Sequence, residues 1–290
     1  MHHKMDETQL LLARQLAKVA LQEDIGPGDI TGKALLSASA QATAAIKFKQ
    51  DGVLAGIDWI KLVFDELDPK ARLEHKAHDG DMLRAGAVVA RITSNHQALV
   101  AGERTVLNFI QRMSGIATLT ARLAQACVGS RAMVLDTRKT TPGLRVFEKY
   151  AVTCGGGVNH RMGLYDEAMI KENHLYLSGL NLGEAIVRLR KASPTAFLTA
   201  EAESVEQAKQ AMECGANVVL LDDFTLDEIR QAVEMRNSNK AFARVQLEIS
   251  GGVNLSNIEE YANTGVERIS VGAVTHSAAA LDISMKVERG

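Results

Sequence analysis

Charged side chains gather at a few points of the chain, in most cases directly after a short apolar run. The cationic or protonatable members are Arg138, Lys139, His160, Arg161 and Lys171. The carboxylates are Glu201, Glu203, Asp222 and Asp223. Each one taken alone is typical of solvated surface or of a structural ion pair. If they share one face, their burial would be costly without a ligand, which indicates a site for a small, highly charged molecule.

The types of these residues indicate which kinds of ligand they could bind. Arginines such as Arg138 and Arg161 grip carboxylates in a bidentate manner, which favours a carboxylated substrate. Two carboxylates on the opposite side, Glu201 and Asp222, are suited to Mg²⁺, which prefers carboxylate and phosphate oxygens. We therefore expect a carboxylated substrate beside a phosphorylated one that is bound with Mg²⁺.

Two glycine-containing segments point to phosphate. They are Ser250-Gly251-Gly252 and Val271-Gly272-Ala273, and each follows an apolar run. Glycine lets backbone N–H groups approach a phosphate, and a following helix would aim its N-terminus at the same point. Loops after the last strands of an α/β barrel commonly bind phosphate.

The elements that must position these residues repeat one pattern from about residue 130 onward. Short apolar runs alternate with amphipathic helices, and the runs cover 133–135, 168–170, 197–200, 218–221, 245–249 and 269–271. Ser204 with Gln207, and Thr225 with Glu228, fit capping boxes. Residues 215 and 265 are glycines where helices should end. The alternation predicts parallel βαβ units in a barrel of six strands, or of seven if 152–154 is also a strand.

The first 115 residues do not show this regular alternation of strands and helices. Helices are expected near 7–22 and 59–66, and strands near 44–49, 53–55, 71–76 and 88–93. A long helix at about 102–116 should lead into the barrel. This part is therefore expected to be a separate α+β domain.

Composition excludes several classes of protein. Of 290 residues, 46% are hydrophobic and 23% are charged, and the net charge is −2. No basic stripe interleaved with aromatic residues occurs, so nucleic acid is an unexpected partner. No apolar run approaches the roughly 20 residues of a membrane span. The 3 cysteines are widely spaced and the N-terminus does not resemble a signal peptide, so we expect a cytoplasmic protein.

Several strings resemble the quinolinate phosphoribosyltransferase family, over about residues 8–287. They are GERTVLN at 102–108, DTRKTTPG at 136–143, NHRMGL at 159–164, IKENH at 170–174, LDDF at 221–224 and EISGG at 248–252. The eight-residue string at 136–143 is highly specific, and the ordered set is more so.

The resemblance implies an activity and an architecture. Quinolinate and phosphoribosyl pyrophosphate would give nicotinate mononucleotide, pyrophosphate and carbon dioxide, in the de novo biosynthesis of NAD. An N-terminal α/β sandwich would comprise residues 1–115, joined by the C-terminal segment 275–290. An open, incomplete α/β barrel of seven strands would comprise residues 116–274. The chain would form a homodimer or a higher oligomer.

The resemblance also implies roles by position. Lys139, Glu201 and Asp222 would be catalytic, with Mg²⁺ held by the last two and by the pyrophosphate. Quinolinate would bind to Thr137, Arg138, Lys139, His160, Arg161 and Lys171, and to Arg104 of the neighbouring subunit. Phosphoribosyl pyrophosphate would bind to Lys139, Glu201, Asp222, Ser250, Gly251, Gly252, Val271, Gly272 and Ala273.

Two positions depart from the family pattern. Asp223 stands where many members have Asn, and Thr199 stands where Glu is expected. Strand alternation puts residues 199, 201 and 203 on one face, and Glu201 is the better candidate than Glu203 for the metal.

Three other functions remain open on the sequence. The nearest is a phosphoribosyltransferase with a different acceptor. Another is a Schiff-base aldolase acting on a phosphosugar through Lys139 or Lys171, which would need a partly neutral lysine. The third is a non-catalytic anion-binding regulator, which the carboxylates Glu201 and Asp222 argue against.

Overall fold

The computed structural model describes residues 3–288 and divides into two compact units. The first unit contains the described residues through Ala121, the segment Thr141–Gly156 and the residues from Ser277 onward. The second unit contains Arg122–Thr140 and Gly157–His276. Among the described residues, no helix is long and apolar enough to cross a membrane.

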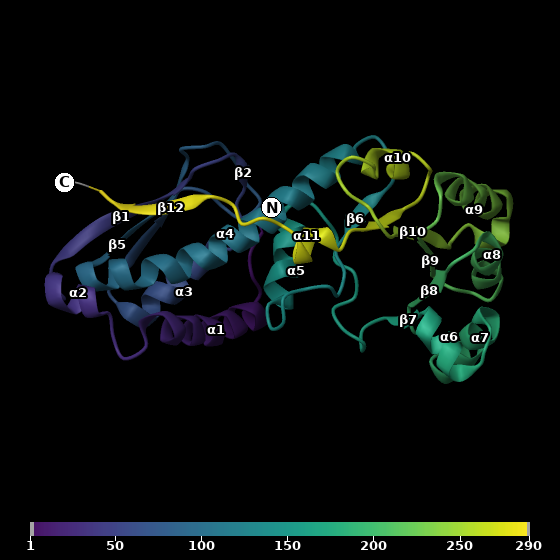
Figure 1. Ribbon diagram of the computed structural model, residues 1–290, viewed down its shortest axis with the longest axis horizontal. Helices are drawn as coiled ribbons and strands as arrows, with labels where there is room; N and C mark the ends of the chain where they lie inside the picture. Colours follow the sequence, from purple (N-terminus) through teal and green to yellow (C-terminus); the bar gives the residue numbers. More distant parts are fainter. Residues whose placement is uncertain (1–2, 289–290) are drawn as a thin grey trace. The chain divides into compact units, whose positions relative to one another are not determined.

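The first unit is built on an antiparallel sheet with the strand order β12-β1-β5-β3. Its strands are β1 (Gln41–Phe48), β3 (Arg72–His75), β5 (Val88–Asn95) and β12 (Ile283–Val287), with a separate pair formed by β2 (Gly52–Val53) and β4 (Met82–Leu83). Its helices are α1 (Glu7–Ile25), α2 (Ile30–Leu35), α3 (Asp58–Leu67), α4 (His96–Ala126) and α5 (Arg145–Cys154). Helices α1, α3 and α4 lie together against the sheet, which gives the expected two-layer sandwich (Figure 1).

The core of this unit contains an aromatic cluster. The Trp59 ring stacks on Phe109 with centroids 3.7 Å apart and meets the edge of Phe147 at 5.0 Å. Helix α4 begins earlier than the expected residue 102, because the Asn95 side chain accepts a hydrogen bond from the Ala98 N–H and caps a start at His96.

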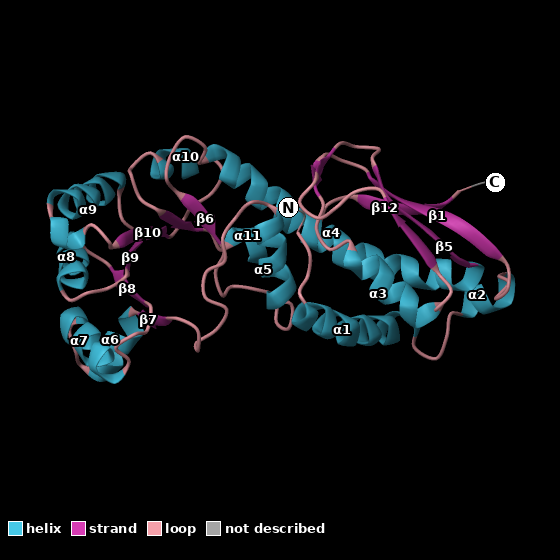
Figure 2. Ribbon diagram, turned by 180° about the vertical axis from the view of Figure 1, so that it is seen from behind, coloured by secondary structure: helices cyan, strands magenta, loops and turns pink. Residues whose placement is uncertain are grey.

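The second unit contains a parallel sheet with the strand order β6-β11-β10-β9-β8-β7. The strands are β6 (Met133–Leu135), β7 (Ala168–Ile170), β8 (Leu198–Ala202), β9 (Val218–Asp222), β10 (Gln246–Ser250) and β11 (Arg268–Ser270). The helices are α6 (Glu172–Ser178), α7 (Leu182–Ala192), α8 (Val205–Glu213), α9 (Leu226–Ser238), α10 (Ile258–Ala262) and α11 (Ala273–His276), with a 3₁₀ turn at Lys240–Phe242. Helices α7, α8 and α9 lie along the outer face of β7–β10 (Figure 2). Strands β6 and β7 are the two edges, so the barrel is open, as expected.

The expected seventh strand is absent from the sheet that residues 3–288 form. Residues 152–154 end helix α5, and what lies beside β6 is a single parallel bridge between Leu135 and Val158. The Val158 N–H donates to Val134 O at 2.9 Å, and the Asp136 N–H donates to Val158 O at 3.3 Å. The prediction of seven strands was wrong because glycines 155–157 leave one residue in register, which is too few to extend a ladder.

The segment 141–156 was expected in the barrel but groups with the first unit. The Tyr150 hydroxyl donates to Asp79 at 2.8 Å, and Arg112 donates to Glu148 at 2.8 Å. With Phe147 against Trp59, these contacts fix α5 within that unit.

The capping signals fix where the barrel helices begin. Thr225 and Glu228 form the expected reciprocal capping box. Ser204 caps α8 by accepting from the Gln207 N–H, but the Gln207 side chain accepts from the Glu203 N–H instead of completing a box. Gly215 and Gly265 adopt positive φ of 88° and 96° after their helices, as expected.

Candidate active site

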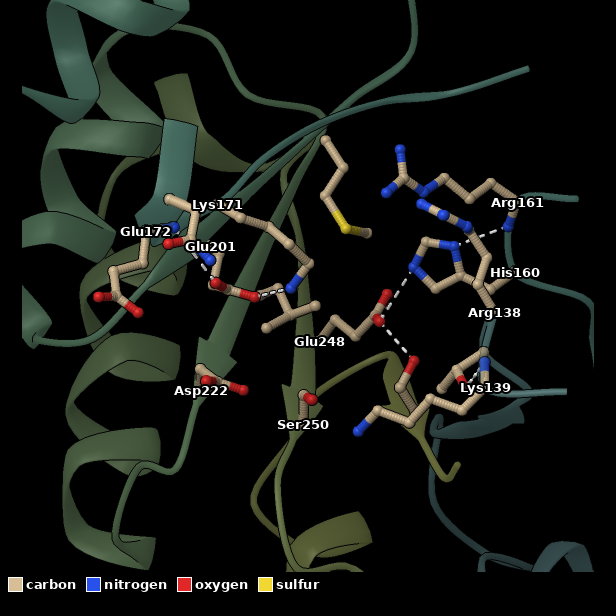
Figure 3. A pocket seen from close by; sticks show the side chains of 15 residues that line it. Arg138, Lys139, His160, Arg161, Lys171, Glu172, Glu201, Asp222, Glu248 and Ser250 are labelled. Carbon is tan, nitrogen blue, oxygen red and sulfur yellow. Dashed lines mark hydrogen bonds and ion pairs between the residues drawn. The ribbon is translucent and has the colours of Figure 1, made fainter. Parts of the chain in front are cut away.

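A pocket of about 350 Å³ opens among the strand ends of the second unit and is lined only by residues of that unit. Figure 3 shows Arg138, Lys139, His160 and Arg161 on one side, Glu201 and Asp222 with Lys171 on the other, and Glu248 between them. The lining residues are Thr137, Arg138, Lys139, His160, Arg161, Met169, Lys171, Glu172, Asn173, Glu201, Leu220, Asp222, Glu248, Ser250 and Ser270.

The pocket brings together nine of the expected site residues. These are Thr137, Arg138, Lys139, His160, Arg161, Lys171, Glu201, Asp222 and Ser250. The remaining glycine-loop residues Gly251, Gly252, Val271, Gly272 and Ala273 adjoin Ser250 and Ser270 in sequence but do not line it. Arg104 is exposed on α4 in the other unit.

Six lining residues had no place in the sequence-based site: Met169, Glu172, Asn173, Leu220, Glu248 and Ser270. The period of two along a strand could have found two of them. Glu248 lies two residues before Ser250 on β10, and Leu220 lies two residues before Asp222 on β9, so each pair shares a face.

The cationic side carries closely spaced charges. Burial lowers the pKa of the Arg161 guanidinium, and the nearby charge of Arg138 lowers it further. Arg161 Nη1 donates to the backbone oxygen of Glu167 at 3.1 Å, which fixes the guanidinium. Two guanidiniums that repel each other favour an anion that reaches both.

The carboxylate side is formed by buried Glu201 on β8 and half-buried Asp222 at the end of β9. Burial raises the pKa of Asp222, and the charges of Glu201 and Asp223 raise it further. Lys171 Nζ forms an ion pair with Glu201 Oε2. Carboxylates in mutual repulsion attract a cation.

These two carboxylates fit a divalent cation that takes further oxygens from a ligand. Within residues 3–288, no group of three or more His, Cys, Asp or Glu side chains is arranged to hold a metal by itself. Mg²⁺ commonly uses one or two carboxylates together with substrate phosphates and water, so the donor set agrees with metal bound together with a phosphorylated ligand.

Three residues near Glu201 and Asp222 lie outside the pocket lining: Thr199, Glu203 and Asp223. Strand β8 ends at Ala202, and Glu203 after it is exposed. Thr199 is buried, and its hydroxyl donates to Glu167. Asp223 adopts a positive φ of 55°. Its Oδ1 lies where a side chain on Gly251 would collide with it, at 1.9 Å from an added Cβ.

The phosphate-type loops differ from expectation in one respect. Helix α10 begins only at Ile258, because the side chains of Asn254 and Asn257 bind Gly252 O at 3.0 and 3.1 Å and hold a turn there. Helix α11 follows Gly272 directly but is one turn long. The expectation of a helix N-terminus directly after the glycines was therefore wrong for the first loop.

An open α/β barrel with such a pocket at its strand ends defines an enzyme of the barrel class that handles anionic substrates. The sequence models for the quinolinate phosphoribosyl transferase C-terminal and N-terminal domains match residues 116–286 and 29–114. The chain belongs to the quinolinate phosphoribosyltransferase family.

Relatives and solved structures agree over nearly full length. The chain is 42% identical over 266 residues to a probable nicotinate-nucleotide pyrophosphorylase (carboxylating) of Bacillus subtilis, covering 91% of this chain and 90% of that one. It is 40% identical over 276 residues to the Mycobacterium leprae nicotinate-nucleotide pyrophosphorylase (carboxylating), covering 94% and 96%. The structure of the nicotinate-nucleotide pyrophosphorylase from Francisella tularensis matches with a TM-score of 0.90 at 34% identity, covering 99% of both chains.

Proposed function

We propose that this chain transfers the phosphoribosyl group of phosphoribosyl pyrophosphate to quinolinate and releases carbon dioxide, giving nicotinate mononucleotide for NAD synthesis. The observation that carries this proposal is a pocket with a cationic wall facing a carboxylate pair, in a chain of this family. The two carboxylates of a diacid would neutralise the cationic side chains, and a metal-bound pyrophosphate would bind at the carboxylates Glu201 and Asp222.

Quinolinate is proposed to bind the cationic wall. Arg138 and Arg161 would take its two adjacent carboxylates, with Lys171 and Thr137 completing the subsite. His160 and its neighbours shape this wall, and Arg104 would enter from a second subunit. Because each carboxylate meets a guanidinium with a fixed fork of donors, the pyridine nitrogen is held in one orientation.

Phosphoribosyl pyrophosphate is proposed to bind on the opposite side. Glu201 and Asp222 would hold Mg²⁺ and the ribose hydroxyls. The backbone of Ser250–Gly252 and of 271–273 would hold the 5′-phosphate. Gly252 has no atom within 4 Å of an added Cβ, so the space beside it is open. Lys139 Cδ lies 3.2 Å from the position of a Cβ on Gly272, so Lys139 can serve both substrates.

The reaction then follows from positioning and charge. The bond between ribose C1 and the pyrophosphate oxygen breaks, and the pyridine nitrogen forms a bond to C1. Bound Mg²⁺ supplies compensation for the charge on pyrophosphate, and Lys139 would add to it. The resulting pyridinium accepts the electron pair of the C–C bond to the adjacent carboxylate. That group leaves as carbon dioxide, and the ring carbon takes a proton.

The lysines argue against the aldolase alternative. A Schiff-base lysine must lose its proton before it attacks a carbonyl, and Lys171 Nζ is instead held against the Glu201 carboxylate. Lys139 stands on the same wall as two arginines that an aldolase would not need.

We also propose a homodimer in the cytoplasm. The exposed Arg104 on α4 is available to a partner subunit. Free cysteines at 127, 154 and 214 agree with a reducing compartment.

The decisive assay uses purified protein, Mg²⁺, phosphoribosyl pyrophosphate and quinolinate labelled at the carboxyl group beside the ring nitrogen. We expect nicotinate mononucleotide and labelled carbon dioxide in equal amounts. Mononucleotide without labelled carbon dioxide would point to another acceptor chemistry. Borohydride-stable labelling of a lysine by a phosphosugar would instead support the aldolase.

A further inference from the structure

Beneath the pocket lies a carboxylate that the mechanism above does not use. Glu248 on β10 is fully buried, with 0% of its surface exposed. Arg268 Nε donates to its Oε2 at 2.6 Å, and the Ser270 hydroxyl donates to its Oε1 at 2.5 Å. Burial alone would raise the pKa of Glu248, but the contact with His160, together with Arg268 and Ser270, holds the pKa low. The chain therefore keeps a buried negative charge at this point at a cost in desolvation.

The imidazole of His160 faces that charge. His160 Nε2 lies 3.2 Å from Glu248 Oε1 (Figure 3). On the other side of the ring, Nδ1 accepts a hydrogen bond from the Arg161 backbone N–H at 2.7 Å. A nitrogen that accepts cannot carry the proton, so the proton is on Nε2, directed at Glu248. A second carboxylate, Glu167, lies 3.8 Å from Nδ1 and is itself bound by Thr199.

Nδ1 of His160 is thus bound by the Arg161 backbone, and Nε2 faces the Glu248 carboxylate in an ion-pair contact at 3.2 Å. The backbone N–H of His160 is engaged as well, since it donates to the buried Asp136 carboxylate at 2.9 Å. In this state the Nε2 side of the ring is turned toward Glu248. The Nδ1 side holds the backbone of Arg161, whose guanidinium reaches the pocket wall.

We propose that Glu248 is a positioning residue for quinolinate: it orients the His160 ring, and His160 in turn holds the Arg161 backbone and guanidinium in place. Arg268 and Ser270 fix the carboxylate, so the support runs from β11 through β10 to the loop at 159–163. This deepens the proposed function and rests on it. It also changes the expected role of His160 from substrate ligand to support for Arg161.

The first test needs no variant and no substrate. The protein is labelled with ¹⁵N-histidine, and the His160 signals are assigned among its 8 histidines by their loss in His160→Gln. We expect a protonated Nε2 and an unprotonated Nδ1 in the free enzyme. A protonated Nδ1, alone or together with Nε2, would overturn the proposal, because Arg161 N–H could then not donate to it.

The second test uses Glu248→Gln, which keeps the shape of the side chain and removes its charge. The Nε2–H preference of His160 should be lost. Quinolinate affinity, measured by calorimetry without the second substrate, should fall roughly tenfold, as expected for one hydrogen bond to a charged group. The KM for phosphoribosyl pyrophosphate should stay within about twofold, a split that simple loss of stability would not give. Equal losses for both substrates, or unchanged quinolinate affinity, would contradict a positioning role.

Two further variants sharpen the assignment. Glu167→Gln is the matched control, since it removes the other carboxylate near the ring, and it should leave the His160 tautomer unchanged. The double variant Glu248→Gln/His160→Gln should bind quinolinate no more weakly than His160→Gln alone, because Glu248 acts through His160. Additive losses would place Glu248 in direct contact with the substrate or in a general structural role. If wild-type protein does not bind quinolinate at all, the proposed function fails, while the tautomer measurement still decides the geometry.

Discussion

Lys171 Nζ and Glu201 Oε2 form an ion pair between the residue that follows β7 and a buried position on the neighbouring strand β8. In the proposed function the lysine would serve the quinolinate subsite and the carboxylate would serve the metal and donor subsite. With those roles, each partner would exchange this contact for a ligand contact when substrates bind. The predictions below depend on that division.

Quinolinate should be used far better than nicotinate, which lacks the second carboxylate. Arg138 and Arg161 would be left with one anion between them, so the half-buried Arg161 would lose a charge-assisted hydrogen-bond partner. We expect kcat/KM for nicotinate to be lower on the order of 10⁴-fold, as for a site built around a polar group that the analogue lacks. Steady-state kinetics with both acids measure this ratio, and equal turnover would exclude quinolinate as the specific acceptor.

Replacing the carboxylates should damage use of the phosphoribosyl donor. Glu201→Gln and Asp222→Asn should lower kcat by roughly 10²-fold, since each loses a group that acts on charge in the transition state. The Mg²⁺ concentration for half activity should rise. Quinolinate affinity alone should hold in Asp222→Asn and hold or tighten in Glu201→Gln, because Lys171 is then released from its ion pair.

Glu203→Gln provides the control for that pair, because Glu203 is exposed and outside the pocket. Glu203→Gln should match wild type both in the Mg²⁺ concentration for half activity and in quinolinate affinity. A collapse of quinolinate binding with unchanged Mg²⁺ dependence in Glu201→Gln would mean that this carboxylate serves the acid rather than the metal.

The two pocket lysines should differ. Lys171→Ala should mainly weaken quinolinate binding, by roughly tenfold or more for loss of one charged contact. Lys139→Ala should raise KM for both substrates and lower kcat further, because Lys139 lies between the wall and Gly272. Initial-rate kinetics over both substrates separate the cases, and identical profiles would contradict the division.

Arg104 should act in the site of a two-fold partner. Arg104→Ala and Lys171→Ala should each inactivate the homodimer. When subunits of the two variants are allowed to exchange, one site of a mixed dimer carries both substitutions and the other carries neither. Random pairing makes half the dimers mixed, so roughly a quarter of wild-type activity should return. The absence of recovery, with exchange verified by mass spectrometry, would place Arg104 in its own subunit's site or in none.

Stability should respond to pH through Asp79. This carboxyl is buried, and burial raises its pKa to about 6 despite hydrogen bonds from the Ile57 and Gly56 N–H groups and from the Tyr150 hydroxyl. A raised folded-state pKa means that stability is greatest below the unfolded value of 3.8 and is lost as pH rises through about 6. Urea unfolding should show Asp79→Asn gaining roughly 3 kcal/mol relative to wild type between about pH 4 and pH 7.

Asp68 offers a contrasting control in the same unit. A hydrogen bond from Ser94, with others from Asn95 and Lys70, lowers the pKa of Asp68. Its contribution is present above the unfolded value and is lost as pH falls. Asp68→Asn should therefore change the pH profile in the opposite direction. A parallel change in both variants would contradict the assignment of Asp79.

The sequence by itself determined the alternation of strands and helices and the residue types after each strand. All six barrel strands begin within one residue of their apolar runs, because short β-branched and aliphatic runs between capped helices have few alternatives. The parallel arrangement then required the polar residues after those strands to meet at one end. Nine site residues could therefore be placed in one pocket before the fold was known.

Only the tertiary structure decided which of these groups contact each other. Glu248 sits inside the run QLEIS, where the sequence gives no sign whether its carboxylate is buried or solvated. The strand order puts β10 beside β11 and β11 beside β6, so that Arg268, Glu248 and the loop carrying His160 converge. Pairings of this kind depend on packing between distant segments, and a local pattern of two or 3.6 residues carries no information about them. The same reason explains why residues 152–154 end a helix and do not form a strand. Helix α5 contacts distant residues, through Tyr150 to Asp79 and through Phe147 to Trp59.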